Sequence, residues 1–341
     1  MAARRGDTLL FPTPPVVAAH AAIGGKKEGE GPLAACFDAL SADNFFGQSS
    51  WEAAEKELAL QTARLCLKKA QTIPEKVSLV LAGDLQAQCT ASSYAMRELG
   101  IPFAGLFGAC STMAEALGLG AALCSAGMAD GLLAMTSSHF CAAERQFRTP
   151  LSYGAVRTPT AQWTATAAGA CLLRPAGEGV QLCAVTFGRV QDYKIKDINN
   201  MGAAMAPAAA ATLLHYLKDT GSAPEDFDRI YTGDLGHVGS QLLRDLLAAE
   251  GLLLKNHVDC GCILYDATEQ TVKSGGSGPG CSASVLCGHI LPRLERGTQK
   301  RALFIATGAL MSQTTFLQKE SIPAIAHLVE LRSPQRKEEN R

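Results

Sequence analysis

The sequence predicts an α/β protein assembled from two copies of one unit. Buried apolar strands alternate with helices along the chain, and the loops between them are short, which is typical of parallel sheets connected by helices. The same order of strand, cysteine-led helix and strand occurs twice within 341 residues. With 47% hydrophobic and 18% charged residues, the chain is able to bury a substantial core.

Two matches within the chain support the duplication. "PEKVSLVLAGDL" from Pro74 aligns with "PEDFDRIYTGDL" from Pro224, and Pro, Glu, Gly, Asp and Leu recur in register. "ACSTM" around Cys110 aligns with "GCSAS" around Cys281, and the same offset carries "LLAMTS" onto "LFIATG". Short apolar strands that end in Gly-Asp recur by chance, but two matches in the same order favour a repeated unit of the fold.

Each copy has the pattern helix, strand, helix, strand. In the first copy "SSWEAAEKELALQTARLCLKKA" predicts an amphipathic helix that opens with a capping box of Ser49 and Glu52. Gly- and Ala-rich helices begin at Cys110 and Cys281, and runs of branched apolar residues predict the buried strands. The strands are expected at 76–83, 131–138, 227–233 and 301–308, and the helices at 49–70, 110–127, 205–221 and 281–297.

We expect the two halves, residues 1–185 and 186–341, to pack as related layers. Helices cover both faces of parallel sheets because the connections between parallel strands place them there. Ligands of such folds bind at the carboxyl ends of the strands. A site is therefore expected between the two halves.

Composition and cysteine spacing exclude several classes of protein. The net charge is −1, from 31 basic and 32 acidic residues, so nucleic acid is not expected as a partner. Twelve cysteines at irregular spacing, without a CxxC pair, indicate thiols in a reducing cytoplasm instead of a disulfide framework. Cys260 and Cys262 are too close together for the usual zinc pairing. Neither a metal nor a cofactor is expected.

The hydropathy of the chain predicts a soluble, intracellular protein. The N-terminus does not have the pattern of a signal peptide, because Asp7 and prolines interrupt the apolar region that one needs. The most apolar later stretches, near 101–135 and 201–217, contain charged residues or proline and many glycines, so none predicts a membrane span. Any contact with a membrane is expected through a partner.

The start of the first buried helix is the strongest candidate for chemistry. The strand "IPFAGLFG" leads Cys110 directly into that helix, where unpaired backbone amides and the helix dipole favour negative charge. This position is expected to lower the pKa of the thiol and make it a nucleophile. The alternative is that Cys110 is a small buried hydrophobic residue, as most cysteines are. Both interpretations stay open.

A duplicated unit with a cysteine at the start of its first buried helix resembles the thiolase fold, which thiolases and ketoacyl synthases share. Longer motifs resemble the stage V sporulation protein AD family of spore-forming bacteria. These motifs occur in order between residues 83 and 327: "GDLQAQ", "LFGACSTM", "SSHFCAAERQF", "RTPTAQWT", "NNMGAAMAPAA", "TGDLGHVG", "GGSGPGCSAS" and "ATGALMS" followed by "SIPAIAH". The resemblance implies five layers in the order αβαβα. Members of the fold commonly pair through the first-half sheet, so a homodimer is expected.

The resemblance also implies that the catalytic machinery of the fold is incomplete here. Condensing enzymes of the fold need a histidine in the second half and a further histidine or asparagine beside the cysteine. The sequence has Gly233 and Asp234 where the ketoacyl synthase histidine would fall, and Pro279 where the asparagine would stand. His237 and His139 are the remaining candidates for a base, and for each of them a structural, hydrogen-bonded histidine is the competing interpretation.

A cysteine without proton-transfer partners suggests a binding site, and the family implies the ligand. That ligand is dipicolinic acid (pyridine-2,6-dicarboxylic acid) or its calcium chelate. A flat aromatic dianion fits amide donors at a helix start, a cleft of small residues and polar groups opposite them. Two aspartates that faced the dianion would repel it unless calcium bridged them or one of them turned away. The expected ligand-binding residues are Asp84, Cys110, Ser111, His139, Asn199, Asp234 and Gly276.

Two further stretches have open interpretations. Arg145, Arg148 and Arg157, in "AERQFRTPLSYGAVRTPTAQWT", are able to bind carboxylates bidentately, and the alternative is a solvated basic face on a connecting loop. Asn199 and Asn200 either line the cleft or cap the helix that follows them.

The function that the resemblance implies is binding of dipicolinic acid, without catalysis, during its uptake into the developing spore. The protein would be the soluble part of a channel complex with membrane-spanning stage V sporulation A subunits, and it would lie peripherally on the forespore or spore inner membrane. One alternative is an active acyltransferase in which Cys110 works with His139 or His237. Another is a structural scaffold of that complex without a small ligand.

Overall fold

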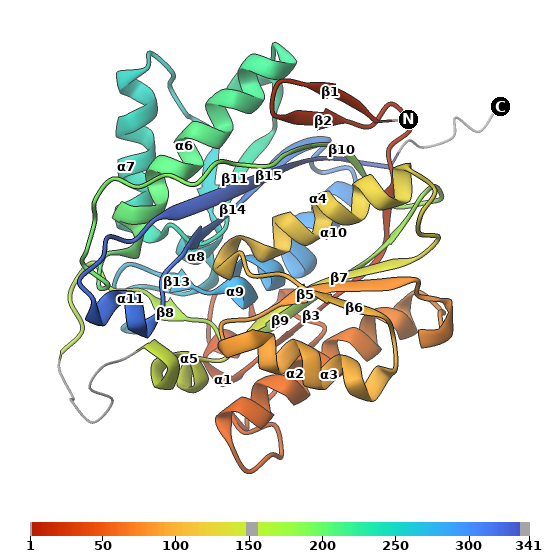
Figure 1. Cartoon of the computed structure of the whole chain (residues 1–341), viewed down its shortest axis with the longest axis horizontal. Coiled ribbons are helices and arrows are strands. Elements are labelled where there is room, and N and C mark those ends of the chain that lie inside the picture. Colours follow the sequence, from red (N-terminus) through yellow and green to blue (C-terminus); the bar gives the residue numbers. More distant parts are fainter. Residues whose placement is uncertain (1, 148–155, 335–341) are drawn as a thin grey trace.

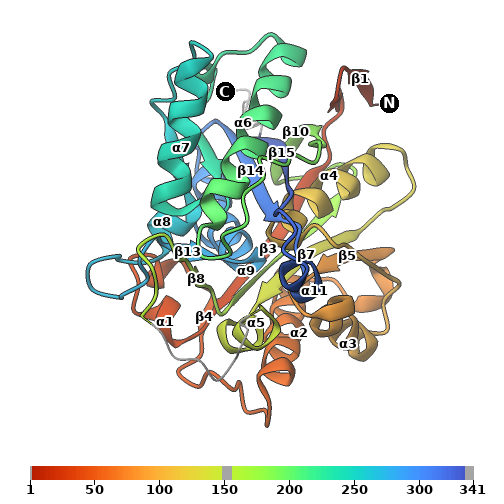
Figure 2. The same cartoon turned by 60° about the vertical axis from the view of Figure 1, so that its left-hand side comes forward.

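Two sheets and three sets of helices alternate in five layers. The structure, a computed structural model, describes residues 2–147 and 156–334. From the bottom to the top of Figure 1, the layers are α2 with α3, the first sheet, α4 with α9 and α10, the second sheet, and α6 with α7. The view in Figure 2 agrees with this arrangement. The expected αβαβα order is confirmed.

Each sheet contains the same arrangement of five main strands. The first sheet has the order β6-β5-β7-β9-β3, and the second has the order β12-β11-β14-β15-β10. In the first sheet only β9 runs against its neighbours, and β15 does so in the second. The bounds are β3 (Val16–Gly24), β5 (Leu79–Gly83), β6 (Phe103–Gly105), β7 (Leu132–Ser138), β9 (Ala167–Arg174), β10 (Val180–Thr186), β11 (Arg229–Thr232), β12 (His257–Asp259), β14 (Arg301–Ala309) and β15 (Ala324–Arg332).

The strands found by the internal sequence matches occupy equivalent places in the two sheets. β5 and β11 each follow a short 3-10 helix, at Pro74–Lys76 and Pro224–Asp226, and β7 and β14 lie beside them. The sheets are joined by antiparallel pairing of β3 with β10, in which Val17 lies opposite Val180. The division expected between residues 185 and 186 falls at the end of β10, and it stays a prediction.

The outer helices cover the faces of the sheets that point away from the centre. α2 (Trp51–Lys69) and α3 (Thr90–Leu99) cover the first sheet, and α6 (Met201–Thr220) and α7 (Gly236–Ala249) cover the second. The predicted capping box at the start of α2 is wrong by one residue. Ser50 is the N-cap and accepts a hydrogen bond from the Ala53 amide at 3.2 Å, while Glu52 forms an ion pair with Arg145.

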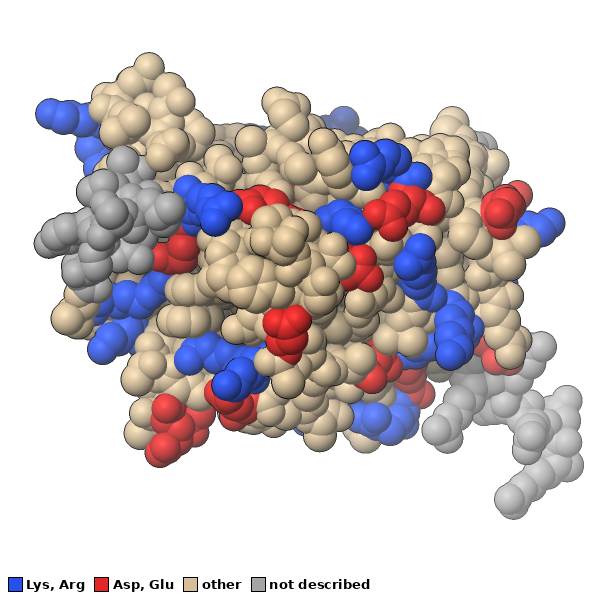
Figure 3. All heavy atoms as spheres, turned by 90° about the horizontal axis from the view of Figure 1, so that it is seen from below, with Lys and Arg blue, Asp and Glu red and all other residues tan. Residues whose placement is uncertain are grey.

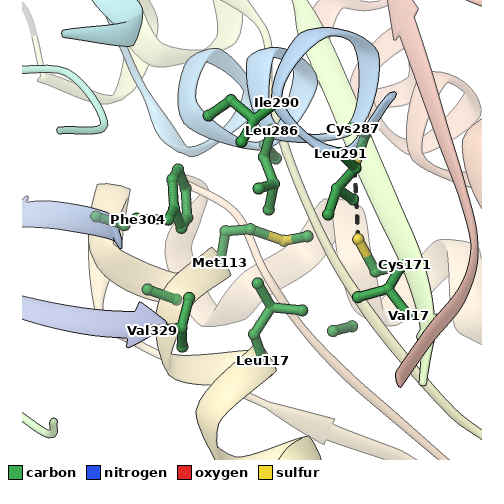
Figure 4. Close-up of a cluster of buried hydrophobic side chains, with 14 of the residues drawn as sticks. Val17, Met113, Leu117, Cys171, Leu286, Cys287, Ile290, Leu291, Phe304 and Val329 are labelled. Atoms are coloured by element: carbon green, nitrogen blue, oxygen red, sulfur yellow. Dashed lines mark hydrogen bonds between the residues drawn. The ribbon is translucent and has the colours of Figure 1, made fainter. Parts of the chain in front are cut away.

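The central helices form the core between the sheets. α4 (Thr112–Ser125) packs beside α9 (Pro279–Val285), which continues through a π-helical turn at 286–290 into α10 (Leu291–Glu295). Figure 4 shows this cluster, which contains Val17, Met113, Leu117, Cys171, Leu286, Cys287, Ile290, Leu291, Phe304 and Val329. A Cβ on Gly169 of β9 would come within 2.4 Å of the Ala283 carbonyl oxygen, so glycine lets α9 rest directly on the first sheet.

Smaller elements complete the fold. They are β1 (Ala3–Arg5), β2 (Thr8–Leu10), α1 (Lys26–Gly29), β4 (Ala39–Leu40), α5 (Phe140–Phe147), β8 (Trp163–Thr164), α8 (Cys260–Leu264), β13 (Gly276–Ser277) and α11 (Gln313–Leu317). β8 and β13 pair in parallel and tie a first-half loop to a second-half loop. None of the helices in the described part of the chain has the length and apolar character that crossing a membrane requires. On the face shown in Figure 3, basic and acidic side chains are interspersed.

Candidate ligand-binding site

A cavity of about 590 Å³ opens between the two halves, with Cys110 in its wall. Cys110 is a buried residue, 8% exposed, that contributes to the cavity lining. Much of the lining is apolar and comes from Leu85, Phe147, Met201, Met205, Met311 and Phe316. Its polar part includes Arg157, Gln162, Lys196, Asn199 and Ser277. A mainly apolar cavity with few polar groups is typical of a small-molecule site.

Two features of the backbone hold the chain around Cys110 in place. Cys110 lies in a 3-10 turn, Ala109–Ser111, that leads into α4. Ala109 has a φ of 51°, a left-handed conformation that alanine adopts rarely. A Cβ on Gly308 of β14 would come within 2.1 Å of the Gly108 carbonyl oxygen. The thiol is therefore held where a first-half helix meets a second-half strand.

Asp234 lies two residues after the end of β11 and interacts with the Cys110 thiol from the second half. Its side chain is fully buried and accepts hydrogen bonds from the Gly278 amide at 2.9 Å and from the Ser277 hydroxyl at 3.1 Å. The Thr307 hydroxyl donates to its other oxygen at 3.0 Å. Burial raises the pKa of Asp234 to about 6, although hydrogen bonding with Cys110 acts in the opposite direction. Near neutral pH the group is mostly a carboxylate.

The Cys110 thiol is not activated by its position at the helix start. Burial raises its pKa well above the ordinary value, and the nearby Asp234 carboxylate raises it further because it disfavours a second negative charge. The expectation of a lowered thiol pKa is wrong. A helix start lowers the pKa of a thiol when no anion is nearby. Here the Asp234 carboxylate lies near the Cys110 sulfur and has the opposite effect on the pKa.

The seven predicted binding residues fall into three groups. Cys110 and Asn199 line the cavity. Asp234 and Gly276 belong to the structure behind its wall, and the Ser111 hydroxyl donates to the Gly108 carbonyl at 2.7 Å. Asp84 and His139 lie outside the cavity lining, and each is engaged in contacts of its own.

His139 holds the start of α5 in place. Its Nε2 contacts the Asn44 carbonyl oxygen at 2.8 Å, and its Nδ1 accepts from the amides of Cys141 and Ala142 at 3.2 and 3.4 Å. Burial lowers its pKa, so the ring is neutral at neutral pH. His237, the other candidate base, is exposed at the start of α7 and does not line the cavity.

Asp84 occupies the place in the first half that Asp234 occupies in the second, but it lies away from the ligand cavity. Its carboxylate accepts from the amide and hydroxyl of Ser92 at 2.8 and 2.7 Å and from the Gln86 amide at 2.9 Å. The Gln86 side chain also donates to Glu55 at 2.9 Å. Burial and then the charge of Asp84 raise the pKa of Glu55 to about 8. The two predicted aspartates therefore do not face one ligand together.

The structure separates the open interpretations of the arginines and asparagines. Arg157 lines the cavity and donates to Glu144 at 2.6 Å, whereas Arg145 pairs with Glu52 and does not line it. Arg148 lies outside the described residues. Asn199 lines the cavity, and Asn200 caps α6 by accepting from the Ala203 amide at 3.3 Å.

Sequence reasoning missed most of the loop residues that shape the cavity. Gln162, Lys196 and Met311 lie in loops whose positions depend on the packing of both halves. The available signal for Gln162 was the motif "RTPTAQWT", which contains it. Met311 lies in the quoted motif "ATGALMS", whereas Lys196 lies in none of the quoted motifs, and single charged loop residues are common.

The groups around the Cys110 thiol differ from those that activate a nucleophilic cysteine. A thiol needs a neighbouring base or a lowered pKa to attack at neutral pH, and none of the described lining residues is a histidine. Pro279 begins α9 where the resemblance places an asparagine, and its carbonyl accepts from the Thr136 hydroxyl at 3.0 Å. Across residues 2–147 and 156–334, no three acidic, histidine or cysteine side chains are grouped to hold a metal ion.

The fold, the duplicated sheets and the cysteine at the start of α4 define a protein of the thiolase-fold class. The chain is similar to 3-oxoacyl-[acyl-carrier-protein] synthase III from Aquifex aeolicus VF5, with a TM-score of 0.55 and 13% identity over 93% of this chain and 99% of that one. It is also similar to cerulenin-bound OleA of Xanthomonas campestris, with a TM-score of 0.62 and 16% identity over 97% of this chain and 99% of that one. At these identities the likeness establishes the fold alone.

A narrower relationship follows from the sequence. The family model of stage V sporulation protein AD matches residues 5–332. Stage V sporulation protein AD of Bacillus subtilis strain 168 is 41% identical over 322 residues, which are 94% of this chain and 95% of that protein. The chain belongs to the stage V sporulation protein AD family, and the resemblance seen in its motifs is confirmed.

Proposed function

We propose that this protein binds dipicolinic acid, or its calcium chelate, in the cavity beside Cys110 and does so without catalysis. Membership of a sporulation family supports a role in the sporulating cell. The identity of the ligand comes from what the resemblance to the family implies, and it is part of the proposal. In the same proposal, the protein takes part in loading the ligand into the developing spore.

The observation that carries the proposal is the pairing of Cys110 with Asp234. A condensing enzyme needs the cysteine as a thiolate, and a carboxylate beside a buried thiol opposes that state. A cavity that keeps its shape while its thiol stays protonated is suited to reversible binding. This is why binding is preferred to acyl transfer.

The walls of the cavity suit a small aromatic ring. Met205, Met311 and Phe316 are among its lining residues, and methionine packs favourably against aromatic rings. The cavity volume of about 590 Å³ lies within the range of small-molecule sites. One aromatic ring with two carboxylates is small enough to enter it.

Charged groups at the cavity suit both forms of the ligand. Arg157 and Lys196 bring positive charge that attracts two carboxylates. Glu144 and Asp197 also line the cavity, and their oxygens suit calcium. Because the described residues contain no preformed metal site, calcium in this proposal arrives with the ligand.

The proposal extends to partners and location. Membrane-spanning stage V sporulation A subunits would form the path for the ligand, and this protein would lie against them at the forespore or spore inner membrane. This arrangement is what the resemblance to the family implies. Pairing of two copies through the first sheet is a further part of the proposal.

A thermal-shift experiment with matched ligands tests the binding proposal. Dipicolinic acid should raise the melting temperature by several degrees at a concentration 100 times its Kd, because a ligand that binds only the folded state stabilises it. Pyridine-3,5-dicarboxylic acid, with the same charge and a different geometry, is the control and should give a smaller shift. Equal shifts, or none with or without calcium, would oppose the proposal.

A thioester assay distinguishes the enzymatic alternative. An acyltransferase would release coenzyme A from acyl thioesters, and Cys110→Ala would abolish that release. We expect no turnover. If neither ligand binding nor turnover is found, a scaffold role becomes the better account.

A further inference from the structure

Gln162 joins the two halves of the fold at the wall of the cavity. It lies just before β8 in the motif "RTPTAQWT", and sequence reasoning gave Gln162 itself no role. Its side-chain nitrogen donates to the Asp234 carbonyl oxygen at 2.7 Å and to the Gly276 carbonyl oxygen at 2.8 Å. One first-half amide thus contacts two separate loops of the second half.

The orientation of this side chain is determined by its partners. A glutamine nitrogen has two N–H groups, and both are directed to main-chain carbonyls of the second half. The Gln162 backbone is fixed as well, because Arg157 donates to its carbonyl oxygen at 2.9 Å. The next residue, Trp163, donates its amide to the Gly275 carbonyl at 2.8 Å.

The two loops that Gln162 joins also hold the group that faces Cys110. The loop at 276–278 supplies the Ser277 hydroxyl and the Gly278 amide that bind the Asp234 carboxylate. Gln162 therefore contacts the main chain of Asp234 and the main chain of the loop that binds its side chain. Moving either loop would move the carboxylate relative to the thiol.

The geometry points to Gln162 as the positioning residue that keeps Asp234 and the loop at 276–278 in place against Cys110. It does this through hydrogen bonds to both loops. If the cavity binds a ligand, Gln162 sets the shape of the cavity wall near Cys110 that the ligand contacts. This part of the inference rests on the proposed function. In terms of the Cys110–Asp234 pair it stands independently of any ligand.

The test compares two glutamines of the same kind. In Gln162→Leu both carbonyl partners lose their donor, which is costly for buried groups. The matched control is Gln299→Leu, because the Gln299 side-chain amide likewise donates within the fold, to the Tyr231 hydroxyl at 2.8 Å, and does not line the cavity. Both variants lose side-chain hydrogen bonds, but only Gln162 lines the cavity together with Cys110.

The decisive readout is the pH profile of Cys110 alkylation by iodoacetamide, followed on the Cys110 peptide by mass spectrometry. In Gln162→Leu the profile should move to lower pH, and alkylation at pH 8 should become about tenfold faster, because the carboxylate no longer opposes the thiolate from a fixed position. Gln299→Leu should leave the profile unchanged. An unchanged profile in Gln162→Leu, or an equal change in Gln299→Leu, would overturn the inference.

Ligand binding gives a second, separable readout. If the wild-type protein binds dipicolinic acid, Gln162→Leu should weaken its binding about tenfold or more, whereas Gln299→Leu should not. Failure of the wild-type protein to bind would overturn the proposed function and leave the alkylation result to decide the role of Gln162. Should Gln162→Leu fail to fold, Gln162→Met replaces it, since an uncharged thioether of similar length cannot donate to either carbonyl.

Discussion

The thiol of Cys110 and the carboxylate of Asp234 lie against each other where the two halves of the fold meet. The carboxylate contributes to the raised thiol pKa, after burial. Replacing Asp234 with Asn removes the charge and retains the shape. We expect Asp234→Asn to lower the pKa of Cys110 and to increase its alkylation rate at pH 8 several-fold.

The control for this prediction comes from the first half. Asp84 is the equivalent of Asp234 by strand order, is also buried, and contacts Ser92 and Gln86 instead of Cys110. Asp84→Asn should therefore leave Cys110 alkylation as in the wild type. A Cys110 thiol that reacted no faster in Asp234→Asn would show that burial alone sets its pKa.

His139 tests whether the cysteine has a distant base. Because its ring connects Asn44 to the start of α5, His139→Ala should lower the free energy of unfolding by about 1–2 kcal/mol. Cys110 alkylation should be unchanged. His237→Ala, at an exposed position, should alter stability by less than about 0.5 kcal/mol. Slower alkylation of Cys110 in His139→Ala would instead support the acyltransferase alternative.

The buried carboxyl group of Glu55 makes stability depend on pH. Its pKa is raised from 4.5 to about 8, so between these values the folded state keeps a proton that the unfolded state releases. The free energy of unfolding should therefore fall as pH rises from 4.5 to 8. Glu55→Gln should make this fall smaller by on the order of 2 kcal/mol. Part of the effect comes from removing the charge beside Asp84.

Denaturant unfolding at pH 5 and pH 8.5 checks the Glu55 prediction. Glu57→Gln is a suitable control, because Glu57 lies on the same helix, is partly exposed and pairs with Lys56. It should leave the difference between the two pH values near that of the wild type. The same pH dependence in all three proteins would contradict the assigned role of Glu55.

The edge of the first sheet predicts how two copies pair. In the described chain β6 pairs with β5 alone, and Phe107 and Tyr94 near this edge are 65% and 50% exposed. Unpaired strand edges and exposed aromatic residues favour association. We expect a dimer in light scattering after gel filtration, and a monomer in Phe107→Asp. Leu253→Asp, at an exposed second-half position, should remain a dimer; a wild-type monomer would contradict the prediction.

The fold could be predicted from the sequence because the two copies of the unit have similar residues at equivalent buried positions. A Gly-Asp pair, Gly83 and Asp84 in the first half and Gly233 and Asp234 in the second, stands at the end of equivalent strands of the two sheets. The residues that define these repeated elements are close together in the sequence, within one strand and its neighbouring helix. Periodicity and self-comparison therefore found the repeated elements, whereas the capping residue of α2 was placed one position too early.

The site was predicted less completely, for a physical reason. Cys110 and Asn199 were found because a helix start and an Asn pair are local signals. The raised pKa of Cys110 depends on Asp234, which is distant in sequence, and the wall at Gln162 depends on how two loops meet. Such relationships arise only when both halves are packed together, so composition and spacing do not contain them.

Calorimetric titration with dipicolinic acid tests the central claim most directly. The wild-type protein should bind it saturably, with or without calcium, and Cys110→Arg should abolish binding by filling the cavity. The control is Cys141→Arg, the same change at a half-buried cysteine of α5 that does not line the cavity, and it should bind as the wild type does. Absence of binding heat in the wild type under both conditions, or undiminished binding by a folded Cys110→Arg protein, would contradict the account.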